Sequence, residues 1–314
     1  MEETFTYDEM SRLAGVTLKR PSGKDLDCAV TYDALGRMTS KQAVTSVNGV
    51  PQVTSVFSSP TFDPSRVHAM ASASVTDGVF PQTAQTISYT GFDKVRTVRQ
   101  GNDSVTYSYG FDHQRFRMEE RISTKTRAKD YVGMCEFVTE SVLAGTVSRS
   151  LTYLMGPFGV FAVVEQVNGT ETLHYVLKDN LGSWTVITDA DGIVEQRLNY
   201  DAWGNLRNPQ RWTNYASGDI SNKPMFDRGF TGHEHLSHFG LINMNGRMYD
   251  PVMSSFLSVD RFMQNPLSAQ ELNPYAYCMY NPLRYVDPTG WAPRPGGGQG
   301  PDNPLPQYLI NGQV

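Results

Sequence analysis

Apolar and polar residues alternate with a period of two along much of the chain. The clearest case is residues 183–188, Ser-Trp-Thr-Val-Ile-Thr, followed by Asp189-Ala-Asp191-Gly192 and a second alternating arm that ends at Tyr200. A period of two places successive side chains on opposite faces of a β-strand, and an Asp-Gly pair favours a tight turn. The segment therefore predicts a hairpin with one apolar face. Stacking on neighbouring hairpins would bury that face and pair the strand edges.

A short aromatic–acid motif recurs where such strands end. Tyr7-Asp8 and Tyr32-Asp33 lie 25 residues apart in nearly the same context, and Tyr200-Asp201 opens a third copy. We expect the Asp to accept backbone N–H groups in an Asx turn and a Gly three residues later to adopt a positive φ. A repeat of about 20–25 residues indicates one supersecondary unit stacked on its neighbours. Looser copies contain Asp179, Asp93 and Asp112.

Other segments have weaker patterns. Residues 40–86 predict strands with a surface excursion around 58–72, and with turns at Asn48-Gly49 and Asp63-Pro64. Residues 119–150 fit either a short helix or more strands, and their Val-Gly and Ala-Gly pairs favour strands. We also expect turns at 156–159 and 167–170, a polar insertion at 207–228, and a flexible Pro/Gly-rich tail from Pro293 onward.

Residues 229–291 differ from the rest of the chain because they are dense in Gly, Pro, Tyr and Asp. Proline and glycine interrupt this stretch every few residues, so no long helix fits through it. We interpret the preceding residues as a wall of stacked hairpins and this stretch as the closure of that wall. The expected fold class is all-β, mostly antiparallel, with little helix.

Composition narrows the class of protein. The 314 residues are 39% hydrophobic and 19% charged, which is enough chain for a large core or two domains. The 27 basic and 32 acidic residues give a net charge of −5, so there is no electrostatic case for nucleic-acid binding. Cys28, Cys135 and Cys278 are odd in number and far apart, which argues against a disulfide framework or zinc knuckle. The sequence contains no run of eighteen apolar residues that could span a membrane. Its acidic N-terminus lacks the apolar core of a signal peptide.

Four motifs in the C-terminal half are specific enough to compare with known families. They are Phe230-Thr-Gly-His-Glu-His, residues 240–251 ending in Gly-Arg-Met-Tyr-Asp-Pro, residues 256–260, and residues 281–290 ending in Asp-Pro-Thr-Gly. Together with the Tyr-Asp repeats, they resemble the Rhs (rearrangement hot spot) repeat-associated core domain. The same repeats occur in the C components of insecticidal toxin complexes and in teneurins.

The resemblance implies a hollow shell of Tyr-Asp (YD) repeats, closed at one end by a core domain that curls inward as a plug. It divides the chain into a YD-repeat segment at 1–174, the core domain at 175–291 and a tail at 292–314. In this family the shell encloses a C-terminal toxin. The core often cleaves the chain just after its Asp-Pro-x-Gly motif.

That cleavage uses two aspartates in the family, and they correspond here to Asp260 and Asp287, with the break expected after Trp291. The enzymatic activity implied is at most a single-turnover aspartyl self-cleavage. The chain departs from the family pattern in two places: Asp260 is followed by Arg-Phe-Met instead of Pro-x-Gly, and Trp291 stands where Leu is common. Both aspartates would equally serve as Asx caps of turns.

Only 23 residues follow Trp291, fewer than a toxin domain needs, so we expect a truncated or orphan shell segment. The partners implied by the resemblance are a C-terminal toxin, its immunity protein and a secretion spike, as in type VI secretion and interbacterial competition. The chain would be made in the cytoplasm and exported by a dedicated secretion system. No cofactor is implied.

Two alternatives come from the residues. On a strand, His233 and His235 would face one side and, with His238, form a weak metal-site candidate, with Glu234 pointing the opposite way. Turn and surface histidines are the simpler interpretation. Tyr and Trp side chains beside Asn and Asp suggest instead a non-enzymatic cell-surface protein that binds glycans or other proteins. The simpler interpretation is that these rings fill the interior of the repeats.

Overall fold

The computed structural model describes residues 2–19, 26–47, 50–75, 84–143, 145–212, 223–262 and 271–296. These residues form antiparallel sheets and short 3-10 turns and contain no α-helix, which confirms the predicted all-β class. The first sheet is a meander of β1 (Glu2–Tyr7), β2 (Leu13–Lys19), β3 (Leu26–Tyr32), β4 (Met38–Val47), β5 (Val50–Asp63) and β6 (Arg66–Val75).

The second sheet is a longer meander in which each strand pairs with the next along the chain. Its strands are β7 (Gln85–Tyr89), β8 (Val95–Gln100), β9 (Asp103–Tyr109), β10 (Arg115–Ile122), β11 (Lys125–Val132), β12 (Cys135–Val142), β13 (Gly145–Gly156), β14 (Gly159–Val167), β15 (Thr170–Lys178), β16 (Trp184–Thr188) and β17 (Val194–Arg197).

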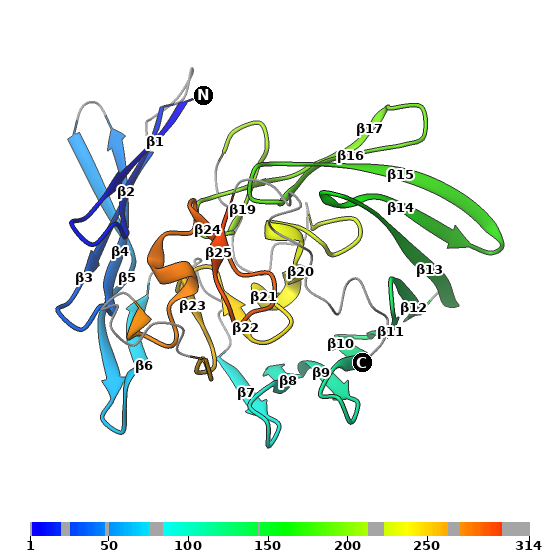
Figure 1. Ribbon diagram of the computed structural model, residues 1–314, viewed down its shortest axis with the longest axis horizontal. Coiled ribbons are helices and arrows are strands. Elements are labelled where there is room, and N and C mark those ends of the chain that lie inside the picture. Colours follow the sequence, from blue (N-terminus) through cyan, green and yellow to red (C-terminus); the bar gives the residue numbers. More distant parts are fainter. Residues whose placement is uncertain are drawn as a thin grey trace.

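The remaining elements lie between the two sheets (Figure 1). We call the described residues 199–207, 223–262 and 271–296 the plug. Its strands are short, two or three residues each, in a stretch where Gly and Pro recur every few residues. They are β18 (Asn199–Tyr200), β19 (Leu206–Arg207), β20 (Glu234–Leu236), β21 (Leu241–Asn243), β22 (Met248–Asp250), β23 (Ser255–Phe256), β24 (Tyr285–Val286) and β25 (Arg294–Pro295).

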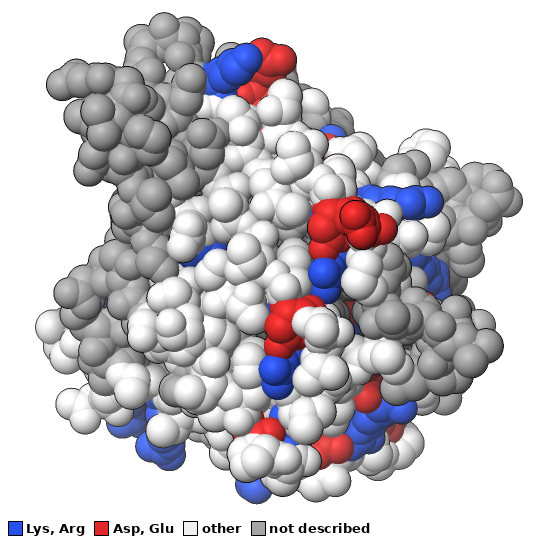
Figure 2. All heavy atoms as spheres, turned by 90° about the vertical axis from the view of Figure 1, so that its left-hand side faces the viewer, with Lys and Arg blue, Asp and Glu red and all other residues white. Residues whose placement is uncertain are grey.

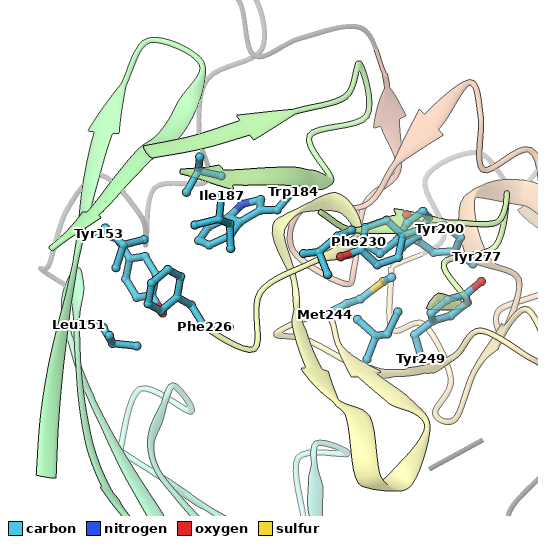
Figure 3. Close-up of a cluster of buried hydrophobic side chains, with 14 of the residues drawn as sticks. Leu151, Tyr153, Trp184, Ile187, Tyr200, Phe226, Phe230, Met244, Tyr249 and Tyr277 are labelled. Carbon is cyan, nitrogen blue, oxygen red and sulfur yellow. The ribbon is translucent and has the colours of Figure 1, made fainter. Parts of the chain in front are cut away.

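Three hydrophobic clusters join the plug to the sheets. The first sheet contributes Leu13 and Phe57 to a cluster that contains Trp203 and Tyr280 of the plug. Strands β7–β10 pack on Leu236, Phe239, Leu241 and Met248. In the largest cluster, Leu151, Tyr153, Trp184 and Ile187 of the second sheet lie on the side of Phe226, while Tyr200, Phe230, Met244, Tyr249 and Tyr277 gather within the plug (Figure 3).

The aromatic–acid motifs form one recurring five-residue corner. Asp33 Oδ1 accepts the N–H of Leu35 at 3.0 Å and that of Arg37 at 3.0 Å, while the fourth residue, Gly36, has φ of 73°. The predicted Asx turn and positive-φ Gly are therefore confirmed. The same pair of bonds is made by Asp8, Asp179, Asp189 and Asp201, and Tyr7, Tyr32 and Tyr200 each stand directly before their corner.

In the first sheet the corners also carry ion pairs. Arg12 and Arg37 each bind the capping aspartate four residues earlier, at 2.7 and 2.6 Å. On the face of the molecule that this sheet forms, acidic and basic atoms lie next to one another and most other described atoms are uncharged (Figure 2). Arg12 and Arg37 thus complete two of the corners in this sheet.

The two degenerate repeats form the same corner, but their aspartates do not open it. Thr90 and Gly110 take the first position, where their N–H groups donate to Lys94 O and Gln114 O, each at 2.8 Å. Asp93 occupies the fourth position, with φ of 57°. Aligning these copies by their aspartates is therefore wrong. The corner requires the backbone bond and one positive φ, and Asp tolerates that φ better than most residues.

The expectations for the weaker segments have mixed outcomes. Residues 119–150 are strands, and turns occur at 156–159 and 167–170, as predicted. The surface excursion at 58–72 is wrong: these residues belong to β5 and β6 around the predicted Asp63-Pro64 turn, and repeated register shifts absorb their irregular pattern. Asn48-Gly49, residues 213–222 of the insertion predicted at 207–228, and the tail beyond 296 lie outside the described residues.

Asp189→Ala is expected to lower the free energy of unfolding by about 1–2 kcal/mol, because it removes the acceptor of two backbone N–H groups in one corner. Asp191→Ala is the matched control, since this exposed side chain lies in the same corner and should change stability by about 0.5 kcal/mol or less. Urea denaturation followed by fluorescence measures both. Equal losses in the two variants would contradict the cap.

Candidate functional site

The plug brings Asp260 and Asp287 to a single guanidinium group. Arg247 Nη2 lies 2.9 Å from Asp260 Oδ2 and 3.3 Å from Asp287 Oδ2. The Arg247 side chain is 2% exposed and also donates to the carbonyl oxygens of Gly290 and Pro274. Its guanidinium carbon stands 3.6 Å from the centre of the Phe256 ring. One buried cation therefore fixes both aspartates, together with the chain that follows Asp287.

Each aspartate also caps a turn. Asp260 N–H donates to Pro274 O at 2.9 Å, and Asp260 Oδ1 accepts the N–H of Phe262 at 2.8 Å. Asp287 Oδ1 accepts the N–H groups of Trp291 at 3.0 Å and Ala292 at 2.9 Å. The Asx-cap role kept open from the sequence is present in both residues. It coexists with the pairing of the two carboxylates.

The bond between Trp291 and Ala292 lies directly at this site. Asp287 Oδ1 is 2.9 Å from the nitrogen of Ala292, which would be the leaving group if this bond were hydrolysed. The loop is held in place because Gly246 N–H donates to Thr289 O at 2.8 Å. Gly290 has φ of 72°, and a Cβ there would lie 2.2 Å from Met244 O. Only glycine fits at this position.

The electrostatics of the two carboxylates follow from burial and from their shared cation. Burial raises the pKa of Asp260 above its ordinary value, and Asp287 adds to the rise, although Arg247 opposes it. Burial lowers the pKa of Arg247, against the pull of the two carboxylates. Two carboxylates with one cation leave one negative charge uncompensated, and burial of Asp260 favours its protonated form.

The three histidines make separate contacts. His233 bonds to Thr231 Oγ1 at 2.7 Å and faces Pro288 O at 3.3 Å, while His235 Nε2 accepts the N–H of Phe230 at 2.9 Å. Burial lowers the pKa of His233 to about 4 and that of His235 to about 3. His238 pairs with Asp103 at 2.8 Å. Within the described ranges, no group of three His, Cys, Asp or Glu residues could hold a metal ion.

Sequence reasoning missed a buried charge cluster between the second sheet and the plug. At its centre Lys129, which is 0% exposed, lies 2.9 Å from Glu136, 2.7 Å from Glu234 and 3.3 Å from Asp227. Around this centre, Arg115 binds Glu234 at 2.8 Å, Arg127 binds Asp227 and Arg228 binds Glu136. We call these seven residues the wall–plug cluster. Its signal in the sequence is that Glu136 stands two residues before Val138 and so shares the inward face of β12; a charged side chain is not expected on that face.

The partners in the wall–plug cluster keep one another charged. Burial would raise the pKa of Asp227, but Arg127 and Lys129 more than reverse this effect and hold it below its ordinary value. Burial would likewise lower the pKa of Lys129, and Glu136, Glu234 and Asp227 raise it instead. The cluster therefore fixes the plug on the second sheet through fully ionised groups.

Comparisons with known proteins agree with this architecture. No protein-family model matches the chain. Among curated proteins, the tRNA nuclease WapA of Bacillus subtilis strain 168 and the tRNA3(Ser)-specific nuclease WapA of Bacillus spizizenii are each 25% identical over 193 residues. That match covers 61% of this chain but only 8% of each relative, so the chain spans a small part of their length.

Solved structures show the same fold. TcdB2-TccC3-Cdc42 superposes with a TM-score of 0.70 at 18% identity, over 92% of this chain and 15% of the other. The Photorhabdus luminescens Tc holotoxin pore carrying TccC3-D651A has a TM-score of 0.67 at 19% identity, over 93% of this chain and 15% of the other. No helix in the described residues is long and apolar enough to cross a membrane. The chain thus has the Rhs-like fold of a toxin-complex shell, as its motifs predicted.

Proposed function

We propose that this chain is the closing segment of an Rhs-type shell that encloses and delivers a C-terminal toxin, and that its plug cleaves the chain after Trp291. One observation carries the cleavage: Asp260 and Asp287 share Arg247, and Asp287 Oδ1 lies 2.9 Å from the nitrogen of Ala292. The shell role is supported by the two sheets that flank the plug (Figure 1) and by the likeness to TcdB2-TccC3 structures and to the tRNA nuclease WapA.

The two carboxylates divide the chemistry between them. Ionised Asp287 takes a proton from the attacking water while the water oxygen bonds to the carbonyl carbon of Trp291. Protonated Asp260, whose pKa burial raises, donates a hydrogen bond to the carbonyl oxygen as negative charge develops there. Asp287 then passes its proton to the nitrogen of Ala292, and the bond between Trp291 and Ala292 breaks. Arg247 is the positioning residue that holds both acids in place.

The biological setting of this proposal follows from the same likeness. The segment after Trp291 is where a toxin would be attached, and an immunity protein and a secretion spike would be its partners. The chain would be synthesised in the cytoplasm and exported by a dedicated secretion system for use in interbacterial competition. Residues 1–174 would serve as the YD-repeat shell segment, 175–291 as the core domain and 292–314 as the tail.

The intact mass of the purified protein tests the cleavage. We expect a species that ends at Trp291 in the native chain, and only full-length mass in Asp287→Asn and in Asp260→Asn, because each change removes one of the two acids. Asp191→Asn, on an exposed corner, is the control and should be cleaved like the native chain. The spectra must be taken near neutral pH, since Asp-Pro bonds such as Asp287-Pro288 break in acid. Full-length mass alone in the native chain would exclude self-cleavage.

The second candidate function is glycan or protein binding, and a surface cleft supports it. The cleft has a volume of about 540 Å³ and lies where β6 and β7, the ends of the two sheets, meet the plug. Tyr89, Tyr275, Arg66 and His68 line it, and the Oγ of Ser258 on its wall has no hydrogen-bond partner in the described part of the chain. A glycan array and a pull-down with the intact chain test this candidate. Binding without cleavage would favour it over the first.

A further inference from the structure

The side chain of Trp291 sits in a slot made by three residues of the plug. Its indole lies so close to Gly246 that a Cβ there would be 2.3 Å from Trp291 Nε1 and 2.5 Å from Cε2. The Phe262 ring meets the indole edge-to-face, with centroids 6.0 Å apart and planes at 86°. The Arg247 guanidinium carbon is 5.5 Å from the centre of the indole. Gly246, Arg247 and Phe262 thus enclose one aromatic side chain.

The two rings stand on the two turns that the site aspartates cap. Asp260 Oδ1 accepts the N–H of Phe262, and Asp287 Oδ1 accepts the N–H of Trp291. Contact between the rings therefore ties one capped turn to the other. Any shift of Trp291 in its slot would also move the nitrogen of Ala292 relative to Asp287.

Trp291 is also a place where this chain departs from the motif pattern, because Leu is common there. In the structure Trp291 contacts Phe262, which fills the variable position of the first motif. Phe262 is 62% exposed, so burial in a core does not account for an aromatic ring at this position.

We propose that Gly246, Arg247 and Phe262 form a recognition slot that selects an aromatic side chain at the residue before the cleaved bond and thereby seats Ala292 on Asp287. This inference rests on the proposed self-cleavage and names the specificity of that site. Aromatic edge-to-face pairs favour a defined geometry over simple burial, which suits a positioning contact. Misplacing a scissile bond by a small distance slows its cleavage strongly.

The rate of cleavage during cell-free synthesis, followed by intact mass near neutral pH, tests the slot. We expect Trp291→Leu and Phe262→Leu each to slow cleavage by about five- to tenfold. The double variant should be no more than about twofold slower than the slower single variant, because both changes break one contact. Trp291→Phe should stay within about threefold of the native chain. Phe111→Leu, on a 99% exposed corner ring, is the control and should cleave normally.

Hydrogen exchange at Ala292 gives a second measurement that does not need cleavage. In the uncut Asp260→Asn chain, adding Trp291→Leu should speed exchange of the Ala292 amide by about fivefold, while adding Phe111→Leu should leave it unchanged. Equal cleavage rates in the native, Trp291→Leu and Phe262→Leu chains would overturn the slot and leave self-cleavage standing. No cleavage in the native chain, with faster exchange in Trp291→Leu, would overturn self-cleavage and leave the slot as a docking contact.

Discussion

Lys129→Met is expected to lower the free energy of unfolding by about 3–5 kcal/mol, the loss typical of breaking one side of a buried ion pair. The variant keeps the length of the side chain but leaves Glu136 and Glu234 without their shared ammonium group. Both carboxylates are almost fully buried, so water cannot replace the lost partner. Because Glu136 lies on the second sheet and Glu234 on the plug, the plug should loosen first.

Urea denaturation near neutral pH measures this loss, and Lys125→Met is the matched control. Lys125 lies on the same strand, β11, with an exposed side chain, so its replacement should change stability by about 0.5 kcal/mol or less. Losses of similar size in the two variants would show that the wall–plug cluster does not hold the plug. Faster hydrogen exchange in β20 than in β2 of Lys129→Met would locate the loosening.

The cluster also sets how stability depends on pH. The pKa values of Asp227 and Glu234 lie below their ordinary values in the folded chain, because nearby cations more than offset the effect of burial. Such groups contribute stability that is fully present above their unfolded pKa of about 4 and is lost as pH falls through the folded pKa. The native chain should therefore lose stability below about pH 4. Lys129→Met should show a weaker loss over the same range.

Local chemistry made much of the fold predictable. The corner at Asp33 needs only one carboxylate and one Gly within four residues, so both residues that form it can be recognised in the sequence. Thr90 and Gly110 form the same corner without that carboxylate, although the Thr90 hydroxyl accepts the N–H of Lys94, so the aspartates of these copies do not mark the register. Backbone bonding determined it instead. The motif at 229–291 likewise predicted a closing element, although which sheet residues it contacts depends on partners far away in the chain.

In the candidate site too, local motifs were predictable and long-range contacts were not. Asp260 and Asp287 were identified by motif, and the structure brings them together. The part played by Arg247 was not identified, because one Arg in a tyrosine-rich motif has no distinctive spacing from two later aspartates. The wall–plug cluster was missed for a related reason. Lys129 and Glu234 are about a hundred residues apart, and they form an ion pair only because the fold buries them together. Long-range pairing of charges leaves no local pattern.

Arg247→Met is expected to abolish the proposed cleavage and to lower the free energy of unfolding by about 3–5 kcal/mol near pH 7. It removes the cation that lies between Asp260 and Asp287 and the donor to Gly290 O and Pro274 O. Asp287 is 1% exposed, so its carboxylate would stay buried without a cation. Cleavage should stop because the two acids would no longer be held against the bond before Ala292.

The pH dependence separates this effect from simple loss of packing. Without Arg247, repulsion would raise the folded pKa of the carboxylate pair above its unfolded value. An acid with a raised folded pKa destabilises the fold above that pKa, and the penalty disappears as pH falls through it. Urea denaturation should therefore find the deficit of Arg247→Met smaller at pH 5 than at pH 7. Arg261→Met, which breaks a half-exposed pair with Asp93, should cost about 1 kcal/mol or less at both. A deficit that is the same at the two pH values would mean that Arg247 acts by filling space, and the aspartate pair would then need another source for its arrangement.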